Sequence, residues 1–125
     1  MAASSISDPL NEAEKRAVRE YLDAADGDWQ SALVLSAHPQ LYNNIGFNCQ
    51  QAVEKYTRAR LLSLGLHPGT SHDLLPILNR LHSCEPVSDE ERRSAIQLNF
   101  FAVHRRYHPE VSPDDLPIDE LLAIA

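Results

Sequence analysis

The sequence predicts an all-α fold, an antiparallel four-helix bundle with a short C-terminal helix, and three observations support this class. Apolar and small residues recur at alternating steps of three and four through long segments, as in helices that pack along one face. Glycines, prolines and capping residues separate these segments. No segment alternates polar and apolar residues as a half-buried strand does. At 125 residues the chain suits a single domain, 1–125, in which 1–8 is expected to be a flexible N-terminus.

The first helix is predicted from Asn11 to about Ala37. Asp8 and Pro9 suit its N-cap and its first helical position. Gly27 interrupts the pattern, and glycine costs roughly 1 kcal/mol relative to alanine inside a helix. We nevertheless expect one long helix, with Gly27 as the place for any kink. The expected packing face consists of Val18, Leu22, Ala25, Trp29, Ala32 and Ser36.

The second helix is expected from about Asn43 to Leu64, and Gly65 suits its C-terminal stop. Its packing stripe follows the spacing of a helix-bundle seam. Because Cys49 falls on that stripe, it is expected to be a small buried hydrophobe. The stripe consists of Ile45, Cys49, Ala52, Tyr56, Ala59 and Ser63.

The third helix is predicted from Asp73 to about His82, with Thr70 or Ser71 as its cap. Ser88 and Glu91 then form a capping box for the fourth helix. Its expected apolar face consists of Ile96, Phe100, Val103 and Tyr107. The segment 117–125 is expected to form the short final helix.

Composition narrows the range of partners and locations. With 11 basic and 18 acidic residues the formal charge is 11 − 18 = −7, which argues against broad nucleic-acid binding and makes RNA a less favoured partner. No apolar run approaches the roughly 20 residues needed to cross a bilayer, so no membrane contact is expected. The N-terminus lacks the features of a secretory signal. With only two cysteines on different elements, we expect no disulfide and a cytoplasmic location.

Three motifs in order resemble the HEPN family (higher eukaryotes and prokaryotes nucleotide-binding domain). They are Gln50-Gln51-Ala52-Val53-Glu54-Lys55, Thr70-Ser71-His72-Asp73-Leu74 and Arg105-Arg106-Tyr107-His108-Pro109. The resemblance implies the same helical bundle and a homodimer. It also implies a pairing with a minimal nucleotidyltransferase, in a toxin–antitoxin or nucleotide-handling system.

The motifs also supply the candidate ligand-binding residues, which would border a polar cleft. An arginine in such a cleft can grip a phosphate with two parallel hydrogen bonds. Glutamine and histidine side chains would add neutral hydrogen bonds, and a tyrosine could stack on a base. The candidates are Gln50, Gln51, Lys55, His72, Arg105, Arg106 and Tyr107.

Structural interpretations compete with this one. Gln50, Glu54 and Arg58 follow each other at i,i+4 spacing, which is equally typical of a solvated or bundle-bridging polar face. For His72 and Asp73, helix capping is the favoured interpretation, with His72 oriented against a neighbouring carboxylate or carbonyl.

No catalytic residue is assigned. Many HEPN proteins are metal-independent ribonucleases with an Arg-x(4–6)-His motif on the last core helix, whereas here Arg105 and Arg106 are followed only by His108, which is too close. Arg60 and His67 have a suitable spacing but straddle the end of the second helix. His104 and His108 have a helical metal-ligand spacing, but two arginines lie between them, so neither a metal nor another cofactor is predicted.

The favoured function is therefore a non-catalytic nucleotide-binding or partner component of a HEPN–nucleotidyltransferase pair. One alternative is a metal-independent ribonuclease toxin with a non-standard arginine–histidine site. The other is a purely structural interaction protein.

Overall fold

The computed structural model describes residues 10–107, except the side chains of Phe100 and residues 102–107. This part of the chain forms four α-helices and one 3-10 turn, which confirms the all-α prediction. The predicted final helix at 117–125 lies outside the described residues. The elements are α1 (Glu12–Leu35), the turn η2 (Pro39–Leu41), α2 (Tyr42–Ser63), α3 (Leu74–His82) and α4 (Asp89–Tyr107).

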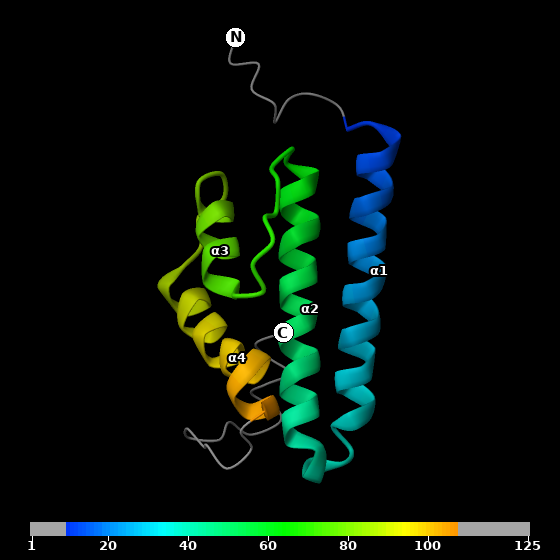
Figure 1. Ribbon diagram of the computed structural model, residues 1–125, viewed down its shortest axis with the longest axis vertical. Coiled ribbons are helices and arrows are strands. Elements are labelled where there is room, and N and C mark those ends of the chain that lie inside the picture. Colours follow the sequence, from blue (N-terminus) through cyan, green and yellow to red (C-terminus); the bar gives the residue numbers. More distant parts are fainter. Residues whose placement is uncertain (1–9, 108–125) are drawn as a thin grey trace.

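Helix α2 is the centre of the arrangement (Figure 1). It pairs with α1 in a long antiparallel hairpin, and α3 and α4 lie against its opposite side. Most of the fully buried side chains come from α2, since it is covered on both sides. Within residues 10–107, no helix combines the length and the apolar character needed to cross a membrane.

The start of α1 differs from the prediction in its capping residue. Asn11 is the N-cap: its Oδ1 accepts from the Glu14 backbone N–H at 2.8 Å, and the Glu14 carboxylate accepts from the Asn11 N–H at 2.9 Å. The predicted cap, Asp8, lies outside the described residues. The helix continues without interruption through Gly27, as predicted. Ala25 and Ala32 are fully buried as expected, but Leu22 is 39% exposed, so its placement on the packing face was wrong.

The packing stripe of α2 is mostly confirmed. Ile45, Cys49, Ala52 and Ala59 are buried, whereas Tyr56 is only partly covered and Ser63 is exposed. Burial raises the pKa of the Cys49 thiol to about 11, which makes it unreactive at neutral pH.

The buried face of α4 is a correction to the prediction. Ile96, expected in the core, is 54% exposed, and the buried residues are Ala95, Leu98 and Phe101 instead. The ring of Phe101 lies over Gly46 of α2, where even a Cβ atom would come within 2.4 Å of the ring. This contact fixes the rotation of α4 and turns Ile96 outward.

The loop between α2 and α3 contains a second correction. Gly65 stops α2 with a φ of 78°, as predicted. The cap of α3, however, is Asp73, whose carboxylate accepts from the Leu75 N–H at 2.9 Å, while the Ser71 hydroxyl accepts from the Asp73 N–H. Asp73 takes this role because it immediately precedes the helix with an extended backbone.

The predicted capping box of α4 is confirmed. The Ser88 hydroxyl accepts from the Glu91 N–H at 3.0 Å, and the Glu91 carboxylate accepts from the Ser88 N–H at 3.1 Å.

Candidate functional site

The polar motif of α2 forms a buried network. Gln50, Glu54 and Arg58 lie one turn apart and are 0%, 3% and 5% exposed. The Arg58 Nε donates to Glu54 Oε2 at 3.3 Å, and the Gln50 amide donates to Glu54 Oε1 at 3.4 Å. A buried ion pair is stable only when hydrogen bonds satisfy its remaining polar atoms. The other partners must therefore be found around it.

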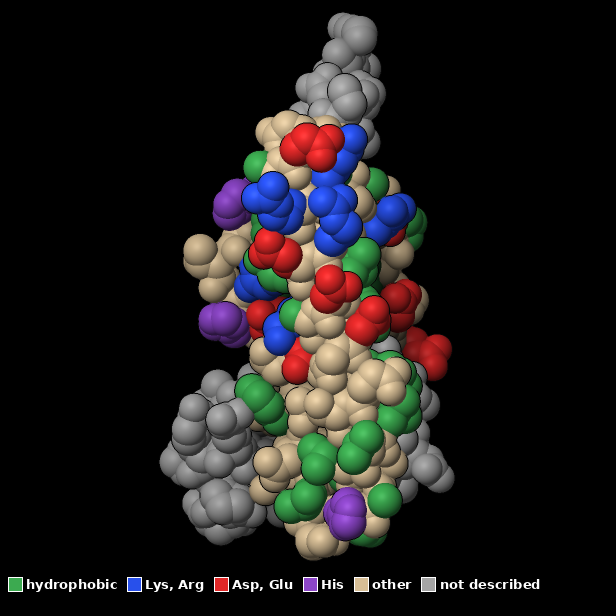
Figure 2. Space-filling model, turned by 90° about the vertical axis from the view of Figure 1, so that its right-hand side faces the viewer, with side chains coloured by type: hydrophobic (Ala, Val, Ile, Leu, Met, Phe, Trp, Pro, Cys, Tyr) green, Lys and Arg blue, Asp and Glu red, His purple; other side chains and the backbone are tan. Residues whose placement is uncertain are grey.

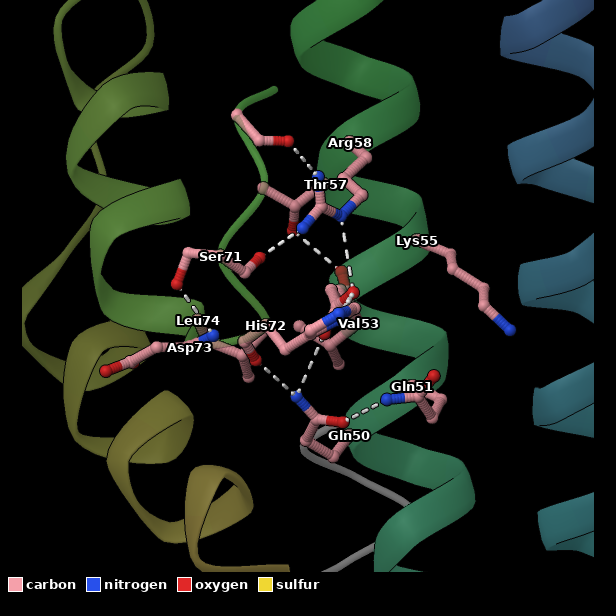
Figure 3. A network of polar contacts seen from close by, with 12 residues as sticks. Gln50, Gln51, Val53, Lys55, Thr57, Arg58, Ser71, His72, Asp73 and Leu74 are labelled. Atoms are coloured by element: carbon pink, nitrogen blue, oxygen red, sulfur yellow. Dashed lines mark hydrogen bonds and ion pairs between the residues drawn. The ribbon is translucent and has the colours of Figure 1, made fainter. Parts of the chain in front are cut away.

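Those partners come from the loop between α2 and α3, which runs along the network (Figure 3). Arg58 Nη1 donates to the carbonyl of Gly69 at 2.8 Å, and Nη2 donates to the carbonyl of Ser71. The Gln50 amide also donates to the carbonyl of His72 at 3.2 Å. The motif thus holds a loop without regular structure against the helix, and the bridging interpretation accounts for these buried side chains.

His72 lies at the surface end of the network. Its side chain is 81% exposed, and its Nδ1 is 3.2 Å from Glu54 Oε2, so the ring is oriented by a neighbouring carboxylate. The adjacent Asp73 caps α3 and also accepts from the side-chain amide of Asn99 on α4. The capping interpretation therefore holds for both residues: Asp73 caps α3, and His72 is oriented against the carboxylate of Glu54.

The other two predicted ligand-binding residues of α2, Gln51 and Lys55, point in different directions. Gln51 donates to the Gln50 side-chain oxygen at 2.7 Å, so it belongs to the same polar group as His72. Lys55 points away from that group toward α1 (Figure 3), where its Nζ is 2.6 Å from Asp28 Oδ2. The structure therefore brings Gln50, Gln51 and His72 together, and Lys55 links the two long helices.

A second polar link joins α1 and α2 beside this one. The Tyr56 hydroxyl donates to Asp26, and the hydrogen bond to that carboxylate raises the pKa of Tyr56.

Arg105, Arg106 and Tyr107 occupy the last turn of α4, and their side chains lie outside the described part. Their assignment to the cleft stays a prediction.

Asn99 is a residue that sequence reasoning missed. Its side-chain oxygen accepts from the Leu74 N–H at 2.9 Å, while its amide donates to Asp73, so it joins α4 to the start of α3. The available signal was an amide side chain between the buried positions of α4. Glu54 and Arg58 were recognised as a pair, but their role in holding the loop was not foreseen.

A cavity of about 350 Å³ lies between α2, α3 and α4. Two glutamates of α4 are among its lining residues and no basic residue is, so it does not suit a phosphate group. Among the described residues, no group of three or more histidine, cysteine or acidic side chains could hold a metal ion. The cavity is lined by Val53, Thr57, Leu78, Leu81, Glu90, Glu91, Ser94, Ala95 and Leu98.

Comparison with known proteins identifies one relationship. The family model described as the HEPN domain matches residues 18–125. Neither a curated protein nor a solved structure matches this chain.

Proposed function

Since this chain belongs to the HEPN domain family, we propose that it is a non-catalytic component of a HEPN–minimal nucleotidyltransferase pair that binds a nucleotide and its partner protein. The observation that carries this proposal is the polar edge of α2, formed by Gln51 of the helix and His72 of the adjacent loop, each of which contacts the buried network. Such a pair would act as a toxin–antitoxin system or a nucleotide-handling system in the cytoplasm.

The spacing of basic residues supports a non-catalytic role. The ribonuclease motif of the family needs an arginine five to seven residues before a histidine on the last core helix. No arginine occupies those positions before His104 or His108. We therefore expect RNA to remain intact when it is incubated with the protein in the presence of a chelator. Cleavage under these conditions would favour the ribonuclease alternative.

The nucleotide would be bound by exposed side chains. Every buried side-chain nitrogen and oxygen in the described part already has a partner, so the interior offers no unused hydrogen bond. Gln51 and His72 can supply hydrogen bonds to a base or sugar. The phosphates would be bound by Arg105 or Arg106, because the charge of Lys55 is already offset by Asp28.

Calorimetry with ATP, GTP and their monophosphates tests the nucleotide part of the proposal. Binding is expected for the wild type, with a strong loss for Arg106→Glu or Arg105→Glu. Arg93→Glu is the matched control, because Arg93 is an exposed arginine of the same helix, outside the proposed site. Equal loss in all three variants would indicate a general effect of charge. If no nucleotide produces a heat of binding, the alternative function, a purely structural interaction protein, would be favoured.

The surface of α1 supports binding of the partner protein and, as we further propose, formation of a homodimer. Figure 2 shows this face: charged side chains gather over one half and hydrophobic side chains over the other. Leu33 and Val34 near the end of α1 are 38% and 69% exposed, and Leu22 is 39% exposed. Exposed apolar side chains of this kind are typical of interaction surfaces when they are contiguous. Co-expression with any minimal nucleotidyltransferase that a neighbouring reading frame encodes, followed by co-purification, tests the pairing.

A further inference from the structure

The histidine rings of the described part differ in how they use Nδ1. In His67 this nitrogen accepts from the Gly69 N–H at 2.9 Å, and in His82 it accepts from the Val87 N–H at 2.8 Å. In His72 it faces the Glu54 carboxylate at 3.2 Å. A backbone N–H can only donate and a carboxylate oxygen accepts, so the two environments select opposite tautomers.

The tautomer decides which nitrogen can react. A neutral imidazole carries one N–H, and the other nitrogen keeps its lone pair. In His67 and His82 the lone pair lies on Nδ1 and is occupied by a hydrogen bond. In His72 the proton lies on Nδ1, so the lone pair lies on Nε2. Since the His72 side chain is 81% exposed, that lone pair is accessible from solvent.

The surroundings of His72 hold this arrangement in place. Its carbonyl accepts from Gln50, and the preceding carbonyl, that of Ser71, accepts from Arg58. Glu54 is itself buried and fixed by Arg58 at 3.3 Å. A carboxylate on one ring nitrogen orients the imidazole and stabilises the positive charge that develops when the other nitrogen attacks an electrophile.

We propose that His72 is a phosphoryl-acceptor site whose Nε2 takes a phosphoryl group from an activated phosphorus compound. The proposal goes beyond the nucleotide-binding function and does not depend on it.

The donor is phosphoramidate with its nitrogen protonated to –NH3+. The Nε2 lone pair forms a bond to phosphorus, the P–N bond of the donor breaks, and ammonia leaves with the bonding electrons. The imidazole ring gains one positive charge. Glu54 holds the Nδ1 proton and offsets that charge, so the product is an Nε2-phosphorylated imidazole beside a buried carboxylate.

The test is chemical phosphorylation of the full-length protein with potassium phosphoramidate at neutral pH. Mass spectrometry would follow the extent of phosphorylation of each histidine over time. The samples are kept out of acid, because N–P bonds are labile in acid. We expect His72 to react several times faster than His38, which is exposed and makes no side-chain polar contact within the described residues. His67 and His82 should react most slowly. NMR should place the phosphorus of His72 on Nε2.

Equal or slower reaction of His72 than of His38, or phosphorus on Nδ1 of His72, would overturn the proposal. Glu54→Gln tests the carboxylate and should lower the rate at His72 severalfold while leaving His38 unchanged. A folded variant that reacts at the wild-type rate would contradict the role given to Glu54. If circular dichroism shows that this variant is unfolded, the proposal is tested by the phosphorylation rates of His72 and His38 in the wild-type protein alone. Nucleotide calorimetry is independent of all these outcomes.

Discussion

Replacing Arg58 by methionine should test the structural role of the polar network most sharply. The change keeps much of the aliphatic packing of the side chain but removes its charge and its donors. Glu54, which is 3% exposed, would lose its cationic partner, and the carbonyls of Gly69 and Ser71 would each lose a donor. Removing one partner of a buried ion pair typically costs about 3–5 kcal/mol of unfolding free energy.

The assay is urea unfolding followed by far-ultraviolet circular dichroism. Arg60→Met is the matched control on the same helix, because Arg60 pairs with Glu85 at the surface, where both side chains are well exposed. The control should lose far less stability, since surface ion pairs contribute little. The double variant Glu54→Gln/Arg58→Met should lose less unfolding free energy than the two single variants lose in sum. A loss below about 1 kcal/mol for Arg58→Met would refute the view that this network holds the loop in place.

Three further predictions concern the packing, the thiols and the surface. Leu98→Ala should cost about 2–5 kcal/mol in urea unfolding, whereas Ile96→Ala should cost little; the reverse order would mean that the rotation of α4 is wrong. A thiol reagent at neutral pH should modify exposed Cys84 quickly and reach Cys49 only on unfolding, because burial raises the pKa of the Cys49 thiol to about 11; rapid reaction of both thiols would contradict its burial. We expect sedimentation equilibrium to show a dimer for the wild type and a shift toward monomer for Val34→Glu; a monomeric wild type would contradict the proposed homodimer, and an unchanged dimer in the variant would exclude this part of α1 from the interface.

The sequence predicted the long helices well because their signals are local. Regular spacing identified the seam of α2, and a single glycine marked its end. The cap of α3 was harder, since Thr70, Ser71 and Asp73 are all capping residues and only the path of the loop selects Asp73. A choice among adjacent candidates of one kind needs the tertiary structure.

The face of α4 was missed for a related reason. Apolar residues lie on both sides of this helix, so periodicity alone does not tell the buried side from the exposed one. The deciding contact is long-range, because Gly46 on α2 leaves the space that Phe101 fills. A glycine inside a helix with a strong packing stripe was the signal available in the sequence.

The candidate site was predictable in its composition but only partly in its geometry. Helical spacing places Gln50, Glu54 and Arg58 on one side of α2, and this follows from the sequence. That Arg58 binds loop carbonyls depends on the path of the loop after Gly65. Whether Lys55 faced the site or α1 depended on Asp28 of the neighbouring helix, a contact that no local pattern encodes.

The most direct test of the proposed function is an NMR titration of isotope-labelled protein with ATP. We expect saturable shifts of the Gln51 side-chain amide, of the His72 ring and of the amides in the last turn of α4. Either Arg105→Glu or Arg106→Glu should abolish these shifts, while Arg93→Glu should keep them. No saturable shift, or shifts confined to the acidic cavity between α2, α3 and α4, would contradict a nucleotide site on the polar edge of α2.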